Sequence, residues 1–268
     1  MASPNSWPAA FALLGPDITA QAGNYLSGSV YWVDSTSSVA SDANAGTEPE
    51  LPKATWLSAY TASTAGDMIL CQPGHAETIA AAQTLAKTDI MTIGLGTGTQ
   101  RPRFTSNVAG VMFTVTGART GFYNCYFPAS TAATTARIAD TTGTELYLNY
   151  CYFECGVNDT TNCVTIAAND AQILNTQFAA TASRPARAVN LTGATSGFIM
   201  QSCVFDGSSY GWTSRAFDVT TGAQTGMLIR DVQLMNRSDF YVSVTGANYK
   251  MFGVRSVDNT GTRIVIAA

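Results

Sequence analysis

The segment Gly121-Phe-Tyr-Asn-Cys-Tyr-Phe127 is the first of a series that repeats along the chain with small variations. The later members are Leu146-Tyr-Leu-Asn-Tyr-Cys-Tyr-Phe153, Ile173-Leu-Asn-Thr-Gln-Phe178, Gly197-Phe-Ile-Met-Gln-Ser-Cys-Val-Phe205 and Gly226-Met-Leu-Ile-Arg-Asp-Val-Gln-Leu234. The closing apolar residues of the series follow one another at intervals of 26, 25, 27 and 29 residues. A repeat of roughly 20 to 50 residues indicates supersecondary units that stack on one another.

A second landmark recurs with the same period. It is a short β-branched run that ends in a Thr-Gly turn, as in Val115-Thr-Gly117, Leu191-Thr-Gly193 and Val244-Thr-Gly246. Within each unit apolar and polar residues alternate, which is the period of a β-strand. These units predict a β-solenoid in which each coil has a strand, a Thr-Gly turn, a second strand, a one-residue kink and a third strand.

Each repeat contains a one-residue break before its last strand. The residues at this kink are Asn124, Tyr150, Asn175, Ser202 and Asp231. Because successive coils stack about 4.8 Å apart, we expect these mostly polar side chains to hydrogen-bond along the stack. The residues directly after the kink are predicted to form an inward column of small side chains: Cys125, Cys151, Thr176, Cys203 and Val232.

This arrangement resembles the right-handed parallel β-helix of the pectate-lyase-like superfamily and of many phage spikes. The resemblance extends over residues 28–268 and implies an all-β fold, a single-stranded right-handed parallel β-helix. It is specific for the fold and carries no active site with it. We expect one β-helix domain over residues 28–268, preceded by an extended N-terminal arm over residues 1–27.

The stretch before the repeats predicts how the solenoid begins. Ser29-Val-Tyr-Trp-Val33 alternates like a strand, and residues 54–62 predict a short helix with Trp56, Leu57 and Tyr60 on one face. Together with Pro73-Gly-His-Ala-Glu77, this order resembles the opening coil of phage and bacterial β-helix proteins. Because the first coil exposes a hydrophobic end, the helix is expected to cap it.

The composition is that of a chain that can bury a large core. Of its 268 residues, 46% are hydrophobic and only 12% are charged, so the fold needs no disulfide or metal ion for stability. The net charge of −4 and the lack of basic runs argue against a nucleic-acid partner. The first basic residue is Lys53, so the N-terminus lacks the positive charge with which a secretory signal begins, and we expect that the protein is not secreted. No apolar run reaches the length of about 18 residues that a membrane helix needs, so we expect no contact with a membrane.

The six cysteines allow two interpretations. Those at the inward positions after the kink are expected to be reduced, because buried thiols behave as small hydrophobic groups. Cys155 and Cys163 could form a disulfide that closes the loop between them, or remain thiols. Their spacing does not predict a zinc site, since no nearby histidine or paired CxxC accompanies them.

Few residues are placed for catalysis. His75 is the only histidine, so it has no partner for a histidine triad or a histidine metal site. We interpret it as a turn residue bonded to the backbone, with Glu77 as the one neighbour suited to proton transfer.

Two carboxylates form the best enzymatic pair on the chain. Glu154 and Asp206 occupy equivalent outward positions two coils apart, near the separation of an inverting glycosidase pair. No third acid or orienting group accompanies them, and the other acids are scattered over the coils instead of clustering as a calcium site requires. We therefore predict no catalytic residue, no metal ion and no cofactor.

Aromatic residues on the outside of the coils are candidates for contact with a partner. Tyr126 and Tyr152 are predicted to stack on adjacent coils, with Tyr123 close by and Val204 extending the apolar row. Three roles fit this pattern: ordinary surface residues, a subunit interface, or a surface on which sugars stack.

Two loops are longer than the others, at residues 128–136 and 206–215. Insertions in a solenoid fall on one face, which is often the binding face, and the second loop carries Tyr210 and Trp212. Arg184, Arg187 and Arg215 lie near coil corners, where they suit either solvent or an interface.

The N-terminal arm contains three apolar residues that could anchor it: Trp7, Phe11 and Leu13. One interpretation is that the arm folds back over the first coil. The other is that it docks on a partner or on a neighbouring subunit.

Together these features favour a structural protein of a bacteriophage virion over an enzyme. We expect a capsid decoration (cement) protein that assembles as a β-helical homotrimer on the head and binds the major capsid protein or another virion protein, with contacts multiplied by its three arms. The alternative is a tail-spike or head-fibre module that binds, and possibly cleaves, polysaccharide of the host surface.

Overall fold

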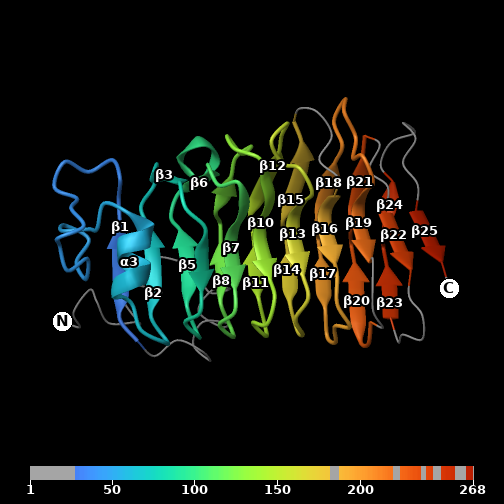
Figure 1. Cartoon of the computed structure of the whole chain (residues 1–268), viewed down its shortest axis with the longest axis horizontal. Coiled ribbons are helices and arrows are strands. Elements are labelled where there is room, and N and C mark those ends of the chain that lie inside the picture. The colour runs from blue at the N-terminus through green and yellow to red at the C-terminus, as the bar shows by residue number, and fades with distance from the viewer. Residues whose placement is uncertain are drawn as a thin grey trace.

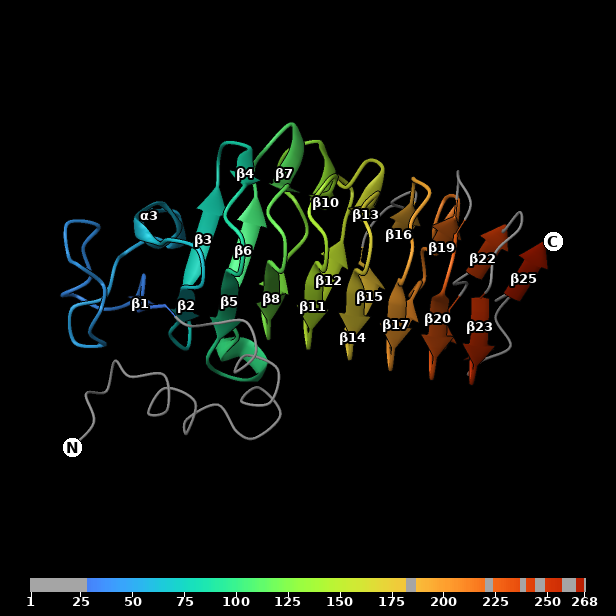
Figure 2. The same cartoon turned by 90° about the horizontal axis from the view of Figure 1, so that it is seen from below.

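The computed structural model describes residues 28–181, 187–219, 224–236, 240–243, 249–256 and 264–267. Within these ranges the chain forms a right-handed solenoid of three parallel β-sheets, seen from two sides in Figures 1 and 2. Each strand pairs in parallel with the strand of the same sheet in the next coil, so the three sheets run the length of the molecule. The predicted fold class is confirmed.

Sheet A has nine strands, and sheets B and C have eight each. The strands of sheet A are β1 (Val30–Val33), β2 (Met68–Cys71), β5 (Met91–Gly94), β8 (Gly121–Tyr123), β11 (Tyr147–Asn149), β14 (Gln172–Leu174), β17 (Ile199–Gln201), β20 (Met227–Arg230) and β23 (Tyr249–Phe252). Those of sheet B are β3 (Ala76–Ile79), β6 (Arg103–Ser106), β9 (Tyr126–Phe127), β12 (Tyr152–Cys155), β15 (Gln177–Ala180), β18 (Val204–Asp206), β21 (Gln233–Met235) and β24 (Arg255–Ser256). Those of sheet C are β4 (Gln83–Leu85), β7 (Gly110–Val115), β10 (Thr134–Asp140), β13 (Asn162–Ile166), β16 (Arg187–Leu191), β19 (Arg215–Val219), β22 (Phe240–Ser243) and β25 (Ile264–Ala267).

The chain passes from sheet A to sheet B through one residue in the left-handed region of backbone conformation. Asn124, Tyr150, Asn175, Ser202 and Asp231 have φ values of 53°, 54°, 47°, 53° and 54°. Each of them donates its backbone N–H to the main chain of the following coil, at distances between 2.9 and 3.2 Å. The predicted kink positions are therefore confirmed.

The expected ladder of kink side chains is replaced by this main-chain ladder. Asn124 Nδ2 donates to the Gly94 and Gly96 carbonyls at 2.8 Å, and Asn175 Nδ2 donates to Asn149 Oδ1 at 2.9 Å. These bonds do reach the preceding coil, but each ends on a residue other than its kink residue. The reason is that positive φ already aims the kink N–H along the stack, so the side chains are left to find other partners.

A ladder of aromatic rings fills the core behind sheet B. Phe127, Phe153, Phe178 and Phe205 are completely buried, with ring centroids of successive pairs 4.5, 5.0 and 5.1 Å apart and nearly parallel planes. Leu234 continues the column. Such stacking adds to the free energy gained by burying the rings and fixes the register between coils.

The small residues after the kinks form the predicted inward column. All are buried: Cys125, Cys151, Thr176, Cys203 and Val232. The Cys203 thiol lies 3.3 Å from the Ile173 carbonyl, and the Thr176 hydroxyl donates to the Leu174 carbonyl at 2.8 Å. These side chains therefore fill space and also satisfy main-chain carbonyls beside the kink.

A short helix, α3 (Trp56–Ala62), covers the N-terminal end of the core as predicted. Its N-cap is Thr55, whose side chain accepts a hydrogen bond from Ser58 N, and its buried Trp56 packs on Phe104, Phe113 and Phe122. Lys87 Nζ donates to the Thr61 carbonyl at 2.9 Å and to the Ser63 carbonyl at 2.7 Å, so a cation stabilises the C-terminal end of the helix. A 3₁₀ turn, η1 (Gly98–Gln100), follows β5.

Candidate functional site

The outer face of sheet B brings together two of the contact residues that the sequence predicts, Tyr126 and Tyr152. The strand register places Arg103, Tyr126, Tyr152, Gln177 and Val204 side by side in one row across five coils. Arg103 and Gln177 are exposed, whereas the two tyrosines and Val204 are half-buried. We call this row, together with Glu154 and Asp206 of the neighbouring row, the sheet B face.

Tyr126 and Tyr152 stack at the centre of the sheet B face, as predicted. Their ring centroids are 5.3 Å apart and their planes differ by 24°. Burial, and then the neighbouring Glu154 carboxylate, raise the pKa of Tyr126. Burial followed by the charges of Glu154 and Asp206 raises the pKa of Tyr152. Both phenols are therefore held neutral, as flat aromatic surfaces with a polar edge.

The two carboxylates of the sheet B face lie in equivalent positions two coils apart. Glu154 pairs with Ala179 of the next coil, and Ala179 pairs with Asp206 of the coil after it. The Glu154 carboxylate raises the pKa of the neighbouring Tyr126 phenol, and Asp206 Oδ1 accepts hydrogen bonds from Ser208 N and Asn236 Nδ2 at 2.8 Å. The two carboxylates thus have different surroundings, since Glu154 lies beside the stacked tyrosines and Asp206 is held by two hydrogen-bond donors.

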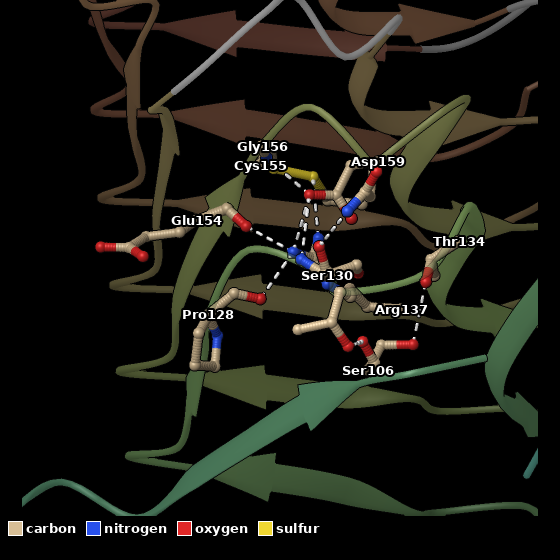
Figure 3. A network of polar contacts seen from close by, with 12 residues as sticks. Ser106, Pro128, Ser130, Thr134, Arg137, Glu154, Cys155, Gly156 and Asp159 are labelled. Carbon is tan, nitrogen blue, oxygen red and sulfur yellow. Dashed lines mark hydrogen bonds and ion pairs between the residues drawn. A yellow bond between two sulfur atoms is a disulfide. The ribbon is translucent and has the colours of Figure 1, made fainter. Parts of the chain in front are cut away.

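A buried arginine anchors the sheet B face from inside (Figure 3), and the sequence analysis missed it. Arg137 Nη2 donates to the Pro128 carbonyl at 2.6 Å, to the Glu154 carbonyl at 2.5 Å and to Asp159 Oδ2 at 2.9 Å. The two carbonyls follow β9 and belong to β12, the strands that carry the stacked tyrosines. Figure 3 shows the Glu154 carboxylate pointing away from Arg137. Arg137 therefore holds the main-chain carbonyl of Glu154 from inside the solenoid, while the side chain lies on the outer face.

The ion pair between Arg137 and Asp159 is almost completely shielded from solvent. The two side chains are 0% and 1% exposed. Burial lowers the pKa of Arg137, and the Asp159 carboxylate opposes that change. Asp159 also accepts a hydrogen bond from Gly156 N at 2.5 Å, which ties the loop between β12 and β13 to the arginine.

A disulfide between Cys155 and Cys163 closes the same loop, which resolves the choice that the sequence left open. The two Cα atoms are 6.6 Å apart, within the range that a disulfide bridges. Cys71, Cys125, Cys151 and Cys203 are buried free thiols, and burial raises the pKa of each. They are therefore poor nucleophiles and act as core residues.

The structure separates the remaining predicted contact residues from the sheet B face. Tyr123 lies in sheet A, where it packs edge-on against Tyr150 with ring centroids 5.5 Å apart. Tyr210 is 44% exposed in the loop before β19. The structure corrects the expectation for Trp212, which is 8% exposed and part of the main core cluster: its large apolar ring turns inward, where it gains more from burial than from contact with water. Trp7, Phe11 and Leu13 lie outside the described residues.

His75 is a structural residue, as interpreted from the sequence. It is completely buried, and its Nδ1 accepts a hydrogen bond from Ser35 N at 3.1 Å. Its Nε2 lies 3.4 Å from Glu77 Oε2. The same Glu77 oxygen accepts from Trp56 N at 2.5 Å, so this carboxylate caps α3 instead of serving a reaction.

Two arginines on sheet C enclose a buried carboxylate. Arg187 Nε lies 2.7 Å from Asp218 Oδ2, and Arg215 Nη1 lies 3.1 Å from Asp218 Oδ1. The Asp218 side chain is 1% exposed, while the two arginines retain 22% and 36%. The arginines are thus held by one buried anion, and Arg184 lies outside the described residues.

In the part of the chain that the structure describes, no group of three or more His, Cys, Asp or Glu residues is arranged to hold a metal ion. Of the helices in the same part, none has the length and apolar character to cross a membrane.

Comparison with known proteins identifies the fold. No family model matches the sequence, and no curated protein matches it significantly. Among solved structures, a pectate lyase superposes with a TM-score of 0.64 at 15% sequence identity, over 88% of this chain and 65% of the lyase. A rhamnogalacturonan lyase gives 0.47 at 13% identity, covering 80% of this chain and 70% of the other, and an alginate lyase from Paenibacillus sp. gives 0.40 at 10% identity, covering 79% and 95%.

The chain thus has the β-helix fold of pectate-lyase-like proteins, and it spans about two thirds of the length of the pectate lyase it superposes on. At this level of identity the likeness concerns the fold alone.

Proposed function

We propose that this protein is a structural β-helix of a bacteriophage virion, of the capsid decoration type, that assembles as a homotrimer through the sheet B face. The observation that carries the proposal is the stacked pair Tyr126–Tyr152 with exposed Arg103 on one side and Glu154 beside it. Tyrosine and arginine are enriched in protein interfaces and dominate their binding free energy. A face held rigid by the aromatic ladder and by Arg137 binds with little loss of conformational entropy.

The state of the two carboxylates supports a binding role over a catalytic one. Asp206 accepts hydrogen bonds from Ser208 N and Asn236 Nδ2, and Glu154 lies beside the stacked tyrosines and raises the pKa of Tyr126. A general acid or base must instead reach a substrate proton. The sheet B face therefore offers shape, aromatic area and fixed charges to a partner, which in a decoration protein is another copy or a virion protein.

The solution mass measured by light scattering tests the trimer. We expect the full-length protein to have the mass of three chains of 28.2 kDa, and the double variant Tyr126→Ser, Tyr152→Ser to have the mass of one. The matched control is Tyr210→Ser, which removes an exposed tyrosine elsewhere and should remain trimeric. A single-chain mass for the unmodified protein would contradict the proposed assembly.

The second candidate is a tail-spike or head-fibre module that binds polysaccharide. The stacked tyrosines favour it as well, because sugar rings pack on aromatic faces while neighbouring carboxylates accept their hydroxyl hydrogen bonds. One of the solved proteins that share this fold is a pectate lyase. Binding to a panel of polysaccharides that is lost in Tyr152→Ala and kept in Tyr210→Ala would favour this candidate, and turnover that is lost in Glu154→Gln would add an enzymatic activity.

A further inference from the structure

The outer face of sheet A carries a second apolar cluster at the N-terminal end of the solenoid. Val30, Trp32, Met68, Leu70 and Ile93 form this cluster apart from the main core, and three half-buried residues pack against it: Met91, Leu95 and Tyr123. These eight residues, which we call the sheet A patch, come from β1, β2, β5, β8 and the turn after β5. None of the eight is charged.

The sheet A patch has the burial of a core although it faces away from the core. Its five central residues are between 0% and 5% exposed. Farther along the same row the strand register leads through Asn149, which is 8% exposed, to Leu174 and Gln201, which are only half-buried. Burial thus decreases along the row away from the patch, and the nearly complete burial of its central residues requires a covering layer.

The described part of the chain does not supply an apolar layer of this kind. The apolar residues that it packs against the cluster belong to sheet A itself or to the turn after β5. The indole Nε1 of Trp32 is also buried without a hydrogen-bond partner among the described residues. An indole N–H is a donor only, so the missing layer should bring an acceptor such as a main-chain carbonyl.

We propose that the sheet A patch is the docking site of residues 1–27 of the same chain. This segment leads directly into β1, whose Val30 and Trp32 belong to the patch. It carries Trp7, Phe11 and Leu13 as apolar groups, and Asp17 is its only charged side chain. An almost uncharged segment with large apolar residues is complementary to an uncharged apolar face.

The length of the segment is sufficient to cover the patch. Strands β1, β2, β5 and β8 are consecutive neighbours in sheet A, so the patch extends over about 15 Å at a strand spacing of about 4.8 Å. Twenty-seven residues reach up to about 90 Å when extended, which allows the segment to cross the patch and return to β1. Its main-chain carbonyls would also supply the acceptor that Trp32 Nε1 lacks among the described residues.

The sequence allows two roles for the arm, folding back on its own solenoid or docking on a partner, and the proposed docking corresponds to the first. In the free protein the arm is stored on its own solenoid, and it reaches a partner only after leaving the sheet A patch. The inference does not depend on the sheet B face, because the two surfaces lie on different sheets.

Photocrosslinking in the full-length chain tests the proposal. The probe is benzoylphenylalanine in place of Met91, a half-buried residue at the rim of the patch, and the control is the same probe in place of Gln172 in β14 of the same sheet. After irradiation, mass spectrometry should find residues 1–27 joined to position 91 and not to position 172. Cross-links from position 91 only to other parts of the chain, or to nothing, would overturn the proposal.

Mixing unlabelled and nitrogen-15-labelled protein identifies the chain that supplies the segment. Docking in the same chain predicts cross-linked peptides of a single label, whereas mixed labels would assign the patch to the arm of a second copy and overturn the proposal as stated. The double variant Trp7→Ser, Phe11→Ser should lose most of the cross-link at position 91 with an unchanged melting temperature of the solenoid. An undiminished cross-link in that variant would contradict the role of these anchors.

Discussion

Asp140 occupies a core position of sheet C, between Val115 of one coil and Ile166 of the next. All three residues are completely buried. Burial raises the pKa of Asp140 from its ordinary value of 3.8 to about 7, and neither carboxylate oxygen has a hydrogen-bond partner among the described residues. An ionisable group in an apolar column makes the stability of the solenoid depend on pH.

The free energy of unfolding should fall as pH rises from about 4 to about 7. In that range the folded chain keeps a proton on Asp140 that the unfolded chain has released, so each rise in pH favours the unfolded state; above pH 7 the loss is complete. The shift corresponds to about 4 kcal/mol. We expect Asp140→Asn to be more stable than the unmodified protein by about 2–4 kcal/mol at pH 8, and nearly equal to it at pH 4, in urea unfolding monitored by circular dichroism. Glu50→Gln, an exposed control, should leave the pH dependence unchanged. If the free energy of unfolding depended on pH in the same way for Asp140→Asn and for the unmodified protein, Asp140 would not be the residue responsible.

Arg137 and Asp159 are a second residue-scale feature with a measurable effect. Replacing Arg137 by Met leaves the Asp159 carboxylate buried without its cation, which should lower the free energy of unfolding by about 3–5 kcal/mol. The double variant Arg137→Met, Asp159→Asn removes that charge while keeping an oxygen for Gly156 N, and should recover part of the loss. Denaturant unfolding of both variants checks this, and a single variant as stable as the unmodified protein would show that the pair does not anchor the loop.

The kinks decide the geometry at the scale of the elements. Ser202 has φ of 53°, where a β-branched side chain collides with its own backbone and glycine does not. Ser202→Val should therefore lower the free energy of unfolding by about 1–2 kcal/mol, and Ser202→Gly should change it by less. Gln172→Val, in an extended strand of the same sheet, is the control for valine itself and should be nearly neutral. Equal stability of the two Ser202 variants would argue against a strained kink.

The sequence predicts the features that every coil repeats. Three features recur at regular intervals: the aromatic column from Phe127 to Phe205, the kinks and the small inward residues. Because a solenoid stacks equivalent positions of successive repeats, these intervals also predict which residues are neighbours in adjacent strands. The capping helix was also predictable, since Trp56 and Tyr60 fall on one face. The Tyr126–Tyr152 stack follows from the same register.

Features that occur in a single coil could not be predicted in this way. Arg137, Asp159 and Asp140 have no periodic counterpart, so nothing in the pattern marks them as buried. Trp212 lies in a long loop, where neither strand period nor coil register says whether the ring turns outward or inward. Strand β4, Gln83–Leu85, lies before the first of the regular repeats, so no recurring landmark indicates it.

The described part of the chain is an elongated solenoid that presents three long faces (Figure 1), each with a different chemistry. Sheet B offers stacked tyrosines and carboxylates, sheet C offers arginines around Asp218, and sheet A offers the apolar patch near β1. A solenoid with side faces of this kind suits contacts along its length, as a decoration protein or a polysaccharide-binding module requires.

Hydroxyl-radical footprinting of the full-length protein, above and below its association concentration, tests most directly whether the sheet B face joins the copies. We expect Tyr126 and Tyr152 to be modified in dilute protein and protected in the assembly, and the exposed Tyr210 to be modified equally in both. Tyr126 and Tyr152 modified to the same extent in both states would contradict the claim that this face forms the interface.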